Sequence, residues 1–354
     1  MKKLAILFGG HSSEYSVSLE SAYSVLSHIN KEKYDLYMIG ITKEGKWYHF
    51  DRDIEQIRDD TWWQNPLHSV TISPEPTQHA FIEMKKDHFI YVYVDAVFPI
   101  LHGQNGEDGT IQALVQLSGI PLIGCSLMSS ALCMDKYRAH AIVSQMGIKT
   151  PKALVLTSSS DLNTFKQEIQ KLHYPLFVKP MKAGSSLGIS KITDFSELKP
   201  AISLAYQYDN EIIIEEAISG FEVGCAIMGT DQLIVGRVDE IELSQGFFDF
   251  TEKYSLKTSQ IHMPARIDSN IEKQIQNTAK IIYQALGCQI FARVDMFLTP
   301  KNEIVFNEVN TIPGFTSHSR FPNMMKGIGL SFTEILDTII EMGLAHENHR
   351  FTSN

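Results

Sequence analysis

The hydrophobic pattern at the start of the chain predicts a strand, a glycine turn and a helix. Residues 3–8 form an apolar run that ends at Gly9, and from Ser13 onward apolar residues recur at helical spacing. Further strands are expected over residues 37–41 and 90–99, and the second of these is almost continuously apolar. Long apolar strands that alternate with helices are typical of a parallel sheet covered on both faces. We therefore predict an N-terminal α/β unit with a doubly wound parallel sheet.

The rest of the chain alternates between shorter strands and helices. A hairpin is expected within residues 80–94, a long loop over 311–327, and the end of the first unit near residue 128. The other predicted elements are strands at 121–123, 153–156, 176–179, 211–216, 222–228, 232–242, 290–298 and 304–310 and helices at 110–119, 129–146, 160–171, 195–208, 271–286 and 331–344. The closely spaced strands of the last third indicate an α+β unit.

Composition and charge narrow the class of protein. The chain has 354 residues, of which 44% are apolar and 20% charged, as in an ordinary globular protein of two or three domains. Its formal net charge of −10 argues against a nucleic-acid-binding protein, because binding to a phosphate backbone needs a clustered basic face. A single nucleotide needs only a few local lysines and a metal ion, so the acidity does not exclude one.

The N-terminal residues and the cysteines predict the compartment. Only five apolar residues, 4–8, follow the first lysines, fewer than the roughly seven that a signal peptide needs. No apolar run approaches the length of a membrane span. The four cysteines are not in C-x-x-C spacing and are expected to be reduced and mostly buried: Cys125, Cys133, Cys225 and Cys288. We expect a cytoplasmic protein without a membrane partner.

Two strands near the C-terminus carry the densest set of candidate ligands. Strand alternation places Arg293 and Asp295 on one face, and the same period sets Glu308 and Asn310 together. If the strands pair as a hairpin about residues 300–302, one face gathers two carboxylates, an amide and a guanidinium. Oxygen ligands of this kind suit Mg2+ that bridges nucleotide phosphates. A solvated strand face with the same charges is the alternative interpretation.

A glycine-serine loop is the second candidate site. Lys179 ends a predicted buried strand and leads into Gly184, Ser185 and Ser186. Small residues let backbone N–H groups approach phosphate oxygens. The Gly-Lys-Ser/Thr ending of a Walker A motif is missing, which disfavours a P-loop fold. An ordinary turn has the same composition, so the loop alone does not decide the function.

Acidic residues flank one further connection. Glu215 and Glu216 end one predicted strand and Glu222 begins the next, with Ile218 in the connection between them. Such a connection suits an adenine edge and a ribose in a nucleotide cleft, and an exposed acidic turn is the alternative.

Two positions near the first strand are candidate contacts for a substrate. Glu14 and Ser18 lie one helical turn apart after the first glycine turn, where they suit either a substrate ammonium or a helix cap. His102 lies in a glycine-rich loop after a predicted buried strand, and such loops bind ligands in parallel sheets. The chain contains no H-E-x-x-H, G-x-S-x-G or G-x-G-x-x-G motif, which excludes the common hydrolase and dehydrogenase classes.

Seven strings in order over residues 3–345 resemble the D-alanine:D-alanine ligase family of ATP-grasp enzymes. Each string is weak alone, and the seven in register are specific. The matching strings are Phe-Gly-Gly-x-Ser-x-Glu at 8–14, Leu-His-Gly-x-x-Gly-Glu-Asp-Gly at 101–109, Met-Asp-Lys at 134–136, Lys-Pro-x-x-x-Gly-Ser-Ser-x-Gly at 179–188, Glu-Lys-Tyr at 252–254, Arg-Val-Asp at 293–295 and Asn-Glu-Val-Asn-Thr-Ile-Pro-Gly-Phe-Thr at 307–316.

The resemblance implies an ATP-grasp fold of three domains and a two-step reaction. The implied domains are 1–128 with the first D-alanine site, 129–216, and 217–347 with a mobile loop at 245–260, followed by a tail at 348–354. ATP, expected between the second and third domains, phosphorylates the carboxylate of D-alanine. The amine of a second D-amino acid then attacks the acyl phosphate, and the tetrahedral intermediate expels phosphate. Such chemistry mainly asks for positioning and charge neutralisation.

The resemblance also implies roles for individual residues. The residues expected to bind ATP are Lys136, Lys179, Ser186 and Lys253 near the phosphates and Glu215, Glu216, Ile218 and Glu222 near the adenine and ribose. Two Mg2+ ions, which Mn2+ can replace, are expected on Asp295, Glu308 and Asn310. The implied catalytic residues are Arg293 and Gly314 for the oxyanion, Glu14 for the substrate ammonium, and Glu14, Ser185 and Tyr254 for a link that closes the mobile loop. The implied substrate contacts are Ser18, His102, Phe250, Ser319 and Arg320.

Two departures from the housekeeping pattern point to the second substrate. Arg320 stands where that pattern has an apolar residue, and Phe250 ends a Phe-Asp-Phe string that replaces Tyr-Asp-Tyr. Both changes resemble the vancomycin-resistance D-alanine:D-serine ligases. An arginine supplies hydrogen-bond donors for a seryl hydroxyl, and a leucine fits a methyl group. The retained Glu-Lys-Tyr at 252–254 argues against the D-lactate type.

We therefore predict a D-alanine:D-serine ligase with residual D-alanine:D-alanine activity. A housekeeping D-alanine:D-alanine ligase is the alternative, and another ATP-grasp carboxylate:amine ligase is a further one. A nucleotide-binding regulatory protein on the same scaffold is disfavoured, because the expected metal and loop residues are present. The expected partners are D-alanine, D-serine and a second copy in a homodimer, and no nucleic acid.

Overall fold

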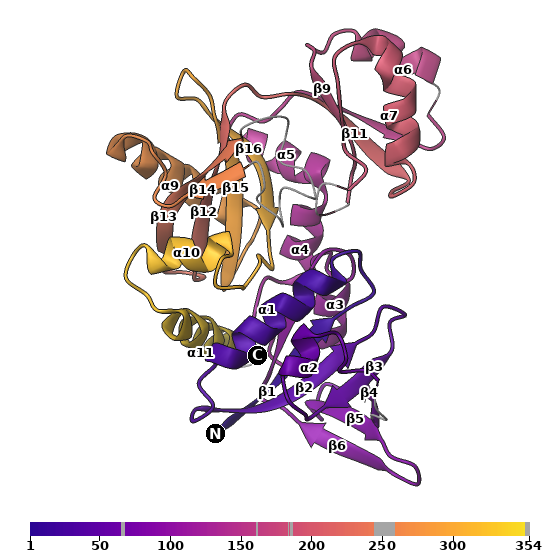
Figure 1. Ribbon diagram of the computed structural model, residues 1–354, viewed down its shortest axis with the longest axis vertical. Helices are drawn as coiled ribbons and strands as arrows, with labels where there is room; N and C mark the ends of the chain where they lie inside the picture. Colours follow the sequence, from indigo (N-terminus) through magenta and orange to yellow (C-terminus); the bar gives the residue numbers. More distant parts are fainter. Residues whose placement is uncertain (65–67, 161, 183, 185–186, 244–258, 351–354) are drawn as a thin grey trace.

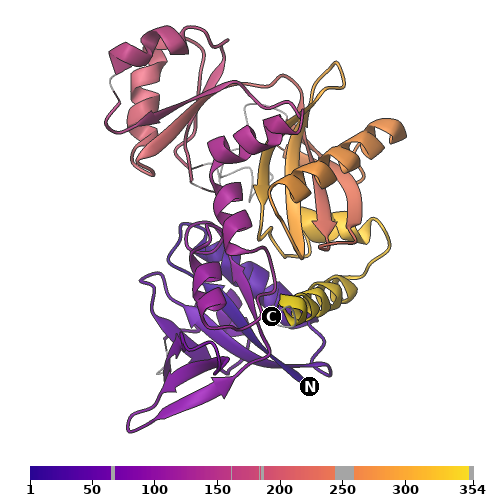
Figure 2. The same ribbon diagram turned by 180° about the vertical axis from the view of Figure 1, so that it is seen from behind.

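The computed structural model describes residues 1–354 except 65–67, 161, 183, 185–186, 244–258 and 351–354 (Figures 1 and 2). Three sheets with their helices follow one another along the chain (Figure 1). Five residues with predicted roles, Ser185, Ser186, Phe250, Lys253 and Tyr254, lie outside the described residues, as does most of the predicted mobile loop.

The first sheet has seven strands in the order β6-β5-β4-β3-β2-β1-β7. Its strands are β1 (Lys2–Gly9), β2 (Tyr34–Ile41), β3 (Trp47–Phe50), β4 (His68–Ile72), β5 (Ala80–Met84), β6 (Phe89–Tyr93) and β7 (Ala96–Leu101), and its helices are α1 (Tyr15–His28), α2 (Glu55–Arg58) and α3 (Thr110–Leu117). Strands β2, β1 and β7 are parallel, as predicted. Strands β3 to β6 add an antiparallel meander, so the sheet is mixed rather than wholly parallel.

Helices cover both faces of the parallel strands. Alternation along β1 directs Leu4 and Ile6 into a core with α1, and it directs Ala5 and Leu7 into a second core with α3. All four side chains are fully buried. This double burial explains why β1 is apolar at every position and not only at alternate ones.

The strand predicted over residues 90–99 is in fact two strands. Edge strand β6 pairs with β5, which confirms the hairpin expected within 80–94, and β7 pairs with β1 near the opposite edge. The chain changes direction at Asp95, whose carboxylate accepts hydrogen bonds from Lys2 Nζ and the Lys3 backbone N–H, each at 2.8 Å. The apolar pattern runs through this corner because both strands are apolar, so periodicity alone could not separate them.

The second and third sheets are antiparallel. The second has the order β10-β9-β11-β8 and comprises β8 (Ala153–Thr157), β9 (Leu176–Pro180), β10 (Ser190–Ile192) and β11 (Glu211–Glu216) with α6 (Leu162–Ile169), the 3-10 turn η1 (Phe195–Glu197) and α7 (Leu198–Ala205). The third has the order β14-β13-β12-β15-β16 and comprises β12 (Phe221–Met228), β13 (Ile234–Leu243), β14 (Ser259–His262), β15 (Phe291–Leu298) and β16 (Ile304–Asn310) with α9 (Ser269–Ala285), α10 (Arg320–Lys326) and α11 (Phe332–Arg350). These elements confirm the α+β character of the last third.

Two predicted segments differ in their helices. The single helix expected over 129–146 is broken into α4 (Leu127–Met134) and α5 (Lys136–Gln145), because Asp135 adopts an extended conformation and caps α5 by accepting the Arg138 N–H at 3.0 Å. The loop expected over 311–327 contains the short helix α10, which begins at Arg320. The register of the β15–β16 hairpin agrees with the prediction.

One hydrophobic core joins the first sheet to the third. Phe98 of β7, Phe291 of β15 and Phe315 meet edge to face, with ring centroids 5.4 to 6.3 Å apart. The side chains of Ile335 and Ile339 on α11 enter the same core, so the last helix packs beside α1 (Figure 1). The first and third sheets are therefore packed together through this core. The second sheet lies beyond α4 and α5 (Figure 2).

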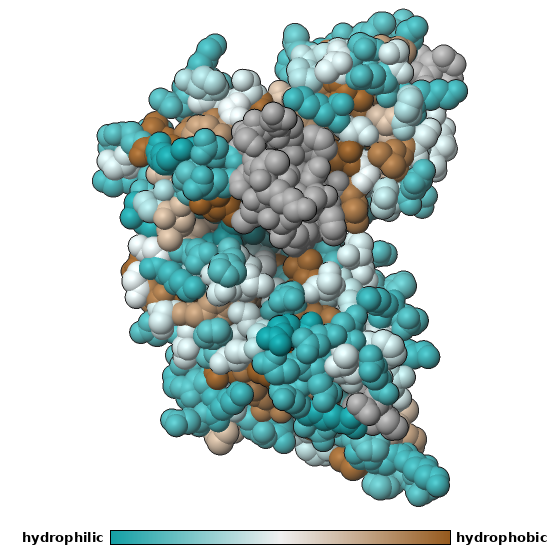
Figure 3. Space-filling view, viewed as in Figure 1, coloured by the Kyte–Doolittle hydropathy of each residue, from teal (hydrophilic) through white to brown (hydrophobic). Residues whose placement is uncertain are grey.

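The surface is largely hydrophilic on the face shown in Figure 3, with apolar side chains in scattered patches. Within the described residues, no helix combines the length and the apolar character that crossing a lipid bilayer requires.

We expect Gly40→Ala to destabilise the first sheet. A Cβ at this position would overlap the Trp62 ring at Cζ3 and Cη2 and lie 2.7 Å from Cε3, and that ring is fully buried. Overpacking of this kind costs about 1–3 kcal/mol, measurable by urea unfolding. In a Trp62→Leu background the overlapping ring is absent, so the same substitution should cost much less. An equal cost in both backgrounds would contradict the explanation.

Candidate active site

A cavity of about 590 Å3 lies where α1, the loop after β7, the third sheet and the start of α10 meet. Seven of the residues predicted from the sequence line it: Glu14, His102, Arg293, Asn310, Gly314, Ser319 and Arg320. A smaller cavity of about 40 Å3 shares Glu14 and Asn310 with it and is also lined by Lys136 and Glu308. Residues that are up to 306 positions apart in the sequence therefore surround one space.

The predicted ligand face on β15 and β16 is present, and its β15 residues are buried while Glu308 and Asn310 are partly exposed. Asp295 pairs in register with Glu308, and Arg293 with Asn310. Arg293 binds the Asp295 carboxylate through Nε to Oδ1 at 2.8 Å and Nη2 to Oδ2 at 2.6 Å, and Asn310 Nδ2 donates to the same Oδ2 at 2.8 Å. Arg293 is 5% exposed and Asp295 1%, so the alternative of a solvated strand face is wrong for this pair.

Arg320 is held by a second carboxylate that sequence reasoning missed. Its Nε and Nη2 donate to Oδ2 and Oδ1 of Asp239, each at 2.8 Å, and its Nη1 donates to Glu222 Oε1 at 2.6 Å. Asp239 is fully buried in β13 and also accepts the Gly224 N–H at 3.0 Å. The strand also carries Arg237, Glu240 and Glu242, so no sequence signal separated Asp239 from these other charges, although a buried carboxylate needs a partner.

Gly224 makes room for this ion pair. A Cβ on Gly224 would lie 2.8 Å from Asp239 Oδ1 and still closer to Nη2 of Arg320. The third sheet therefore carries a glycine where α10 brings the guanidinium against it, and any larger residue would displace the pair.

The buried cluster of charges carries an excess of carboxylates. Its members are the guanidinium groups of Arg293 and Arg320 and the carboxylates of Glu222, Asp239, Asp295 and Glu308. Burial raises the pKa of Glu222 to about 7, with repulsion from Asp295 and Glu308 adding to the shift against the attraction of Arg320. Because four carboxylates face two guanidinium groups, the cluster has a negative potential that a cation would neutralise.

This donor set fits a divalent metal only in part. Among the described residues, no three His, Cys, Asp or Glu side chains lie together as a metal cage. Asp295, Glu308 and Asn310 supply hard oxygen donors on one face, and the negative potential favours a cation. Mg2+ commonly takes one or two protein carboxylates and completes its shell with phosphate oxygens and water, so these residues fit Mg2+ that arrives with a nucleotide.

Glu14 lies against two loops at the other side of the cavity. It is 6% exposed, and a Cβ on Gly103 or on Gly184 would overlap its carboxylate. The absence of side chains at these two glycines lets the carboxylate approach both backbones. Gly184 belongs to the glycine-serine loop, so Glu14 adjoins the segment with which the sequence associated it.

Ser18 does not have the expected position. Its side chain is fully buried, accepts the Gly9 N–H at 2.8 Å and donates to the Ile100 carbonyl, so it ties β1 to β7. It is not among the residues that line the cavity. The prediction that Ser18 meets a substrate ammonium is therefore corrected: it lies on the inner face of α1, one turn beyond Glu14.

The residues predicted to bind ATP separate into two groups. Lys179 on β9 forms a buried ion pair with Glu215 on β11, with Nζ to Oε1 at 2.5 Å. Oε2 of Glu215 is buried and has no hydrogen-bond partner within the described part of the chain, so a further donor would be stabilised there. Lys136, at the start of α5, is also buried.

Glu216 and Glu222 lie away from that pair. Glu216 follows Glu215 on the strand and so faces the opposite side, where its Oε1 accepts the His173 N–H at 2.9 Å. Glu222 is bound to Arg320, as described above. Ile218, between the two strands, is partly buried. The Glu216 side chain thus lies on the opposite face of β11 from the Lys179–Glu215 pair, and its role in binding the nucleotide stays a prediction.

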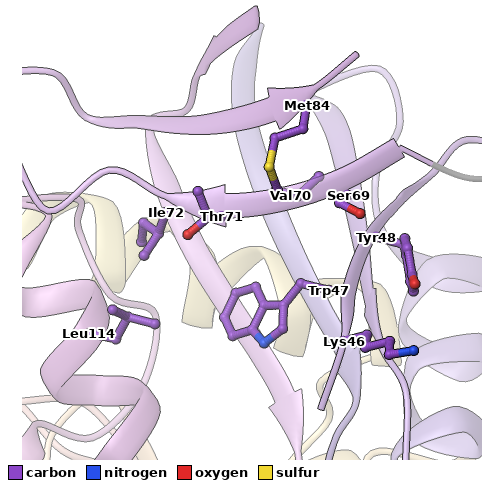
Figure 4. Close-up of a pocket in the computed structure, with 9 residues that line it drawn as sticks. All are labelled: Lys46, Trp47, Tyr48, Ser69, Val70, Thr71, Ile72, Met84 and Leu114. Atoms are coloured by element: carbon purple, nitrogen blue, oxygen red, sulfur yellow. The ribbon is translucent and has the colours of Figure 1, made fainter. Parts of the chain in front are cut away.

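A further cavity lies apart from these residues. It measures about 550 Å3 and is formed by β3, β4, β5 and α3, with Trp47 and Leu114 across it from Met84 (Figure 4). Its described lining has one charged side chain, Lys46, and none of the predicted site residues. The chemistry suggested by the sequence is therefore concentrated in the cavity beside the buried charges.

We expect Arg320→Leu to destabilise the protein by about 3–5 kcal/mol, because it leaves the buried Asp239 carboxylate without its charged partner. The double variant Asp239→Asn, Arg320→Leu removes both charges and should recover much of that loss. Urea unfolding of wild type, both single variants and the double variant measures the coupling. Arg58→Leu, at an exposed ion pair, is the control and should unfold at nearly the wild-type urea concentration. If the loss of stability in the double variant equalled the sum of the losses in the two single variants, a strong interaction between Asp239 and Arg320 would be contradicted.

Comparison with known proteins places the chain in a family. The model of the D-ala D-ala ligase N-terminus matches residues 3–125, and that of the D-ala D-ala ligase C-terminus matches residues 142–341. The vancomycin C-type resistance protein VanC1 of Enterococcus gallinarum is 42% identical over 99% of this chain and 100% of its own length. A D-alanine–D-alanine ligase of Caldicellulosiruptor bescii is 41% identical over 97% of this chain and 95% of its own.

The solved structures agree with this assignment. The VanG D-Ala:D-Ser ligase from Enterococcus faecalis superposes with a TM-score of 0.90 at 56% identity, over 97% of this chain and 99% of that one. The D-alanine-D-alanine ligase from Coxiella burnetii superposes with a TM-score of 0.88 at 27% identity, over 99% and 96%. The fold is thus the ATP-grasp fold of these enzymes, and the chain belongs to the D-alanine:D-alanine ligase family and is an ATP-dependent ligase.

Proposed function

We propose that this enzyme joins D-alanine to D-serine and makes D-alanyl-D-alanine as a lesser product. The observation that carries the proposal is Arg320 in the cavity wall, fixed by the buried Asp239 carboxylate. The 56% identity to the VanG D-Ala:D-Ser ligase supports it.

The held guanidinium suits recognition of a hydroxyl. Asp239 holds the Nε and Nη2 edge, so the orientation of the group is set before a substrate binds. Nη1 contacts Glu222 and lies 3.4 Å from Asp295. We propose that a seryl hydroxyl takes a position beside this nitrogen. A methyl group cannot accept a hydrogen bond from the guanidinium, whereas a seryl hydroxyl can, which favours D-serine over D-alanine.

The surrounding residues suit the chemistry of the family. We propose that Glu14 binds the ammonium of the first D-alanine and that Arg293 and the Gly314 N–H stabilise the oxyanion of the tetrahedral intermediate. Lys136, Lys179 and Glu215 would bind ATP. The nucleotide brings Mg2+, which Asp295, Glu308 and Asn310 would hold and which neutralises phosphate charge. We also propose that the chain has three domains, with limits at 1–128, 129–216 and 217–347. We propose that the enzyme forms a homodimer.

A D-alanine:D-alanine ligase is the second candidate. Relatives of about equal identity have names of both kinds, with 42% to the resistance protein VanC1 and 41% to a D-alanine–D-alanine ligase of Caldicellulosiruptor bescii. Overall similarity therefore does not distinguish the two candidate functions. The pocket for the second substrate has to distinguish them.

The purified enzyme should release phosphate from ATP faster with D-alanine plus D-serine than with D-alanine alone. Mass spectrometry of the products should find D-alanyl-D-serine in excess when both amino acids are present at equal concentration. D-lactate in place of D-serine is the control acceptor and should give little product. Equal or greater formation of D-alanyl-D-alanine would overturn the assignment of D-serine.

Removing the guanidinium should shift the preference toward D-alanine. Because Arg320→Leu alone leaves Asp239 unpaired, the test compares Asp239→Asn with the double variant Asp239→Asn, Arg320→Leu. The ratio of kcat/KM for D-serine to that for D-alanine should fall about tenfold to hundredfold, the value of one hydrogen bond from a charged donor. Arg58→Leu should leave the ratio unchanged. An unchanged ratio in the double variant would exclude Arg320 from the recognition of the second substrate.

A further inference from the structure

Ser21 is a buried polar residue on α1 to which no role has yet been assigned. Its side chain is fully buried and lies two helical turns after Glu14, on the face that packs against the sheet. Its hydroxyl contacts two distant segments: Oγ lies 2.9 Å from His102 Nε2, and it accepts the Phe315 N–H at 3.3 Å. One hydroxyl therefore connects α1 with the loop after β7 and with the loop that carries Gly314.

The surrounding partners determine the direction of these hydrogen bonds. His102 Nδ1 lies 2.9 Å from the carbonyl oxygen of Ile312, which can only accept, so Nδ1 carries the proton. In the neutral ring Nε2 is then an acceptor, and the Ser21 hydroxyl donates to it. The lone pairs of the same oxygen receive the Phe315 N–H. Donor and acceptor capacity of Ser21 are both used, in a space without solvent.

A carboxylate completes the connection. Glu107 Oε1 accepts the Ile312 N–H at 3.0 Å, and its Oε2 accepts the Gly103 N–H at 3.0 Å. Ile312 is thereby held at both its N–H and its C=O, and Phe315 is held at its N–H. The segment between them contains Gly314, which lines the active-site cavity. The two ends of this segment are thus anchored to the N-terminal part of the molecule.

We propose that Ser21 is a positioning residue, whose hydroxyl holds the His102 ring at Nε2 and the Phe315 N–H in place and so aims the Gly314 N–H at the reacting carbonyl. The proposal rests on the proposed function, in which Gly314 stabilises the oxyanion. A hydrogen bond to an oxyanion is used mainly in the transition state, so loss of its aim lowers kcat more than it raises KM. His102, with both ring nitrogens bound by protein groups, acts through the loop that it holds.

The test compares Ser21→Ala and Ser21→Cys with Ser24→Ala. Cysteine nearly preserves the volume but hydrogen-bonds weakly, so it separates hydrogen bonding from packing. Ser24, one turn further on the same helix, is also buried and is the matched control. We expect kcat to fall about tenfold to hundredfold in both Ser21 variants, with KM for ATP within twofold of wild type, and wild-type kinetics for Ser24→Ala. A Ser21→Cys enzyme with wild-type kcat would show that only volume matters and would overturn the proposal.

A second readout does not depend on turnover. Long-range 1H–15N NMR of the imidazoles, with the His102 signals assigned from a His102→Gln variant, reports which ring nitrogen carries the proton. We expect the Nδ1–H tautomer in both enzymes, because the Ile312 carbonyl stays in place. In Ser21→Cys the 15N resonance of Nε2 should move downfield, because this nitrogen loses the hydrogen bond that it accepts. An unchanged Nε2 resonance in the variant would overturn the proposal even if kcat fell. If wild type released no phosphate with D-amino acids, the proposed function would fail, and the NMR result would still decide whether Ser21 holds His102.

Discussion

The buried pairing of guanidinium groups with carboxylates on the third sheet is the interaction on which the site depends. Arg293 with Asp295 and Arg320 with Asp239 are ion pairs with at least one fully buried partner, and neither charge could remain there alone. Arg293 and Asp295 are neighbours on one face of β15, whereas Arg320 reaches Asp239 of β13 because the short helix that begins at Arg320 packs against the sheet. The excess of carboxylates gives this cluster a negative potential, which stabilises a metal ion and the guanidinium donors.

The site also depends on a joint between two parts of the chain. Phe98, Phe291 and Phe315 pack together across the first and third sheets. Because Gly314 directly precedes Phe315, this contact also fixes one end of the loop that carries Gly314. Hydrogen bonds that Ser21 and Glu107 accept from backbone N–H groups of the same loop hold it from the side of α1 and β7. The cavity at this joint has walls from both parts, while the packed aromatic rings keep those walls from separating.

Local periodicity was enough to predict some of this arrangement. Alternation in a strand has a period of two whatever surrounds it, so Arg293, Asp295, Glu308 and Asn310 could be placed on one face before any contact was known. The same reasoning failed over residues 90–99, where two apolar strands meet at a corner, and at Ser18, whose hydroxyl binds backbone that periodicity does not locate.

Most strands and helices, the family and the chemical types in the site could be predicted from the sequence, because these depend on short-range patterns and on strings of residues. The partners of the buried polar groups depend on the fold. Asp239 lies 81 positions from Arg320, and Ser21 lies 294 from Phe315, so no spacing rule relates them. Burial made these contacts obligatory, since a carboxylate, a guanidinium or a backbone N–H removed from water must find its partner wherever the fold brings one.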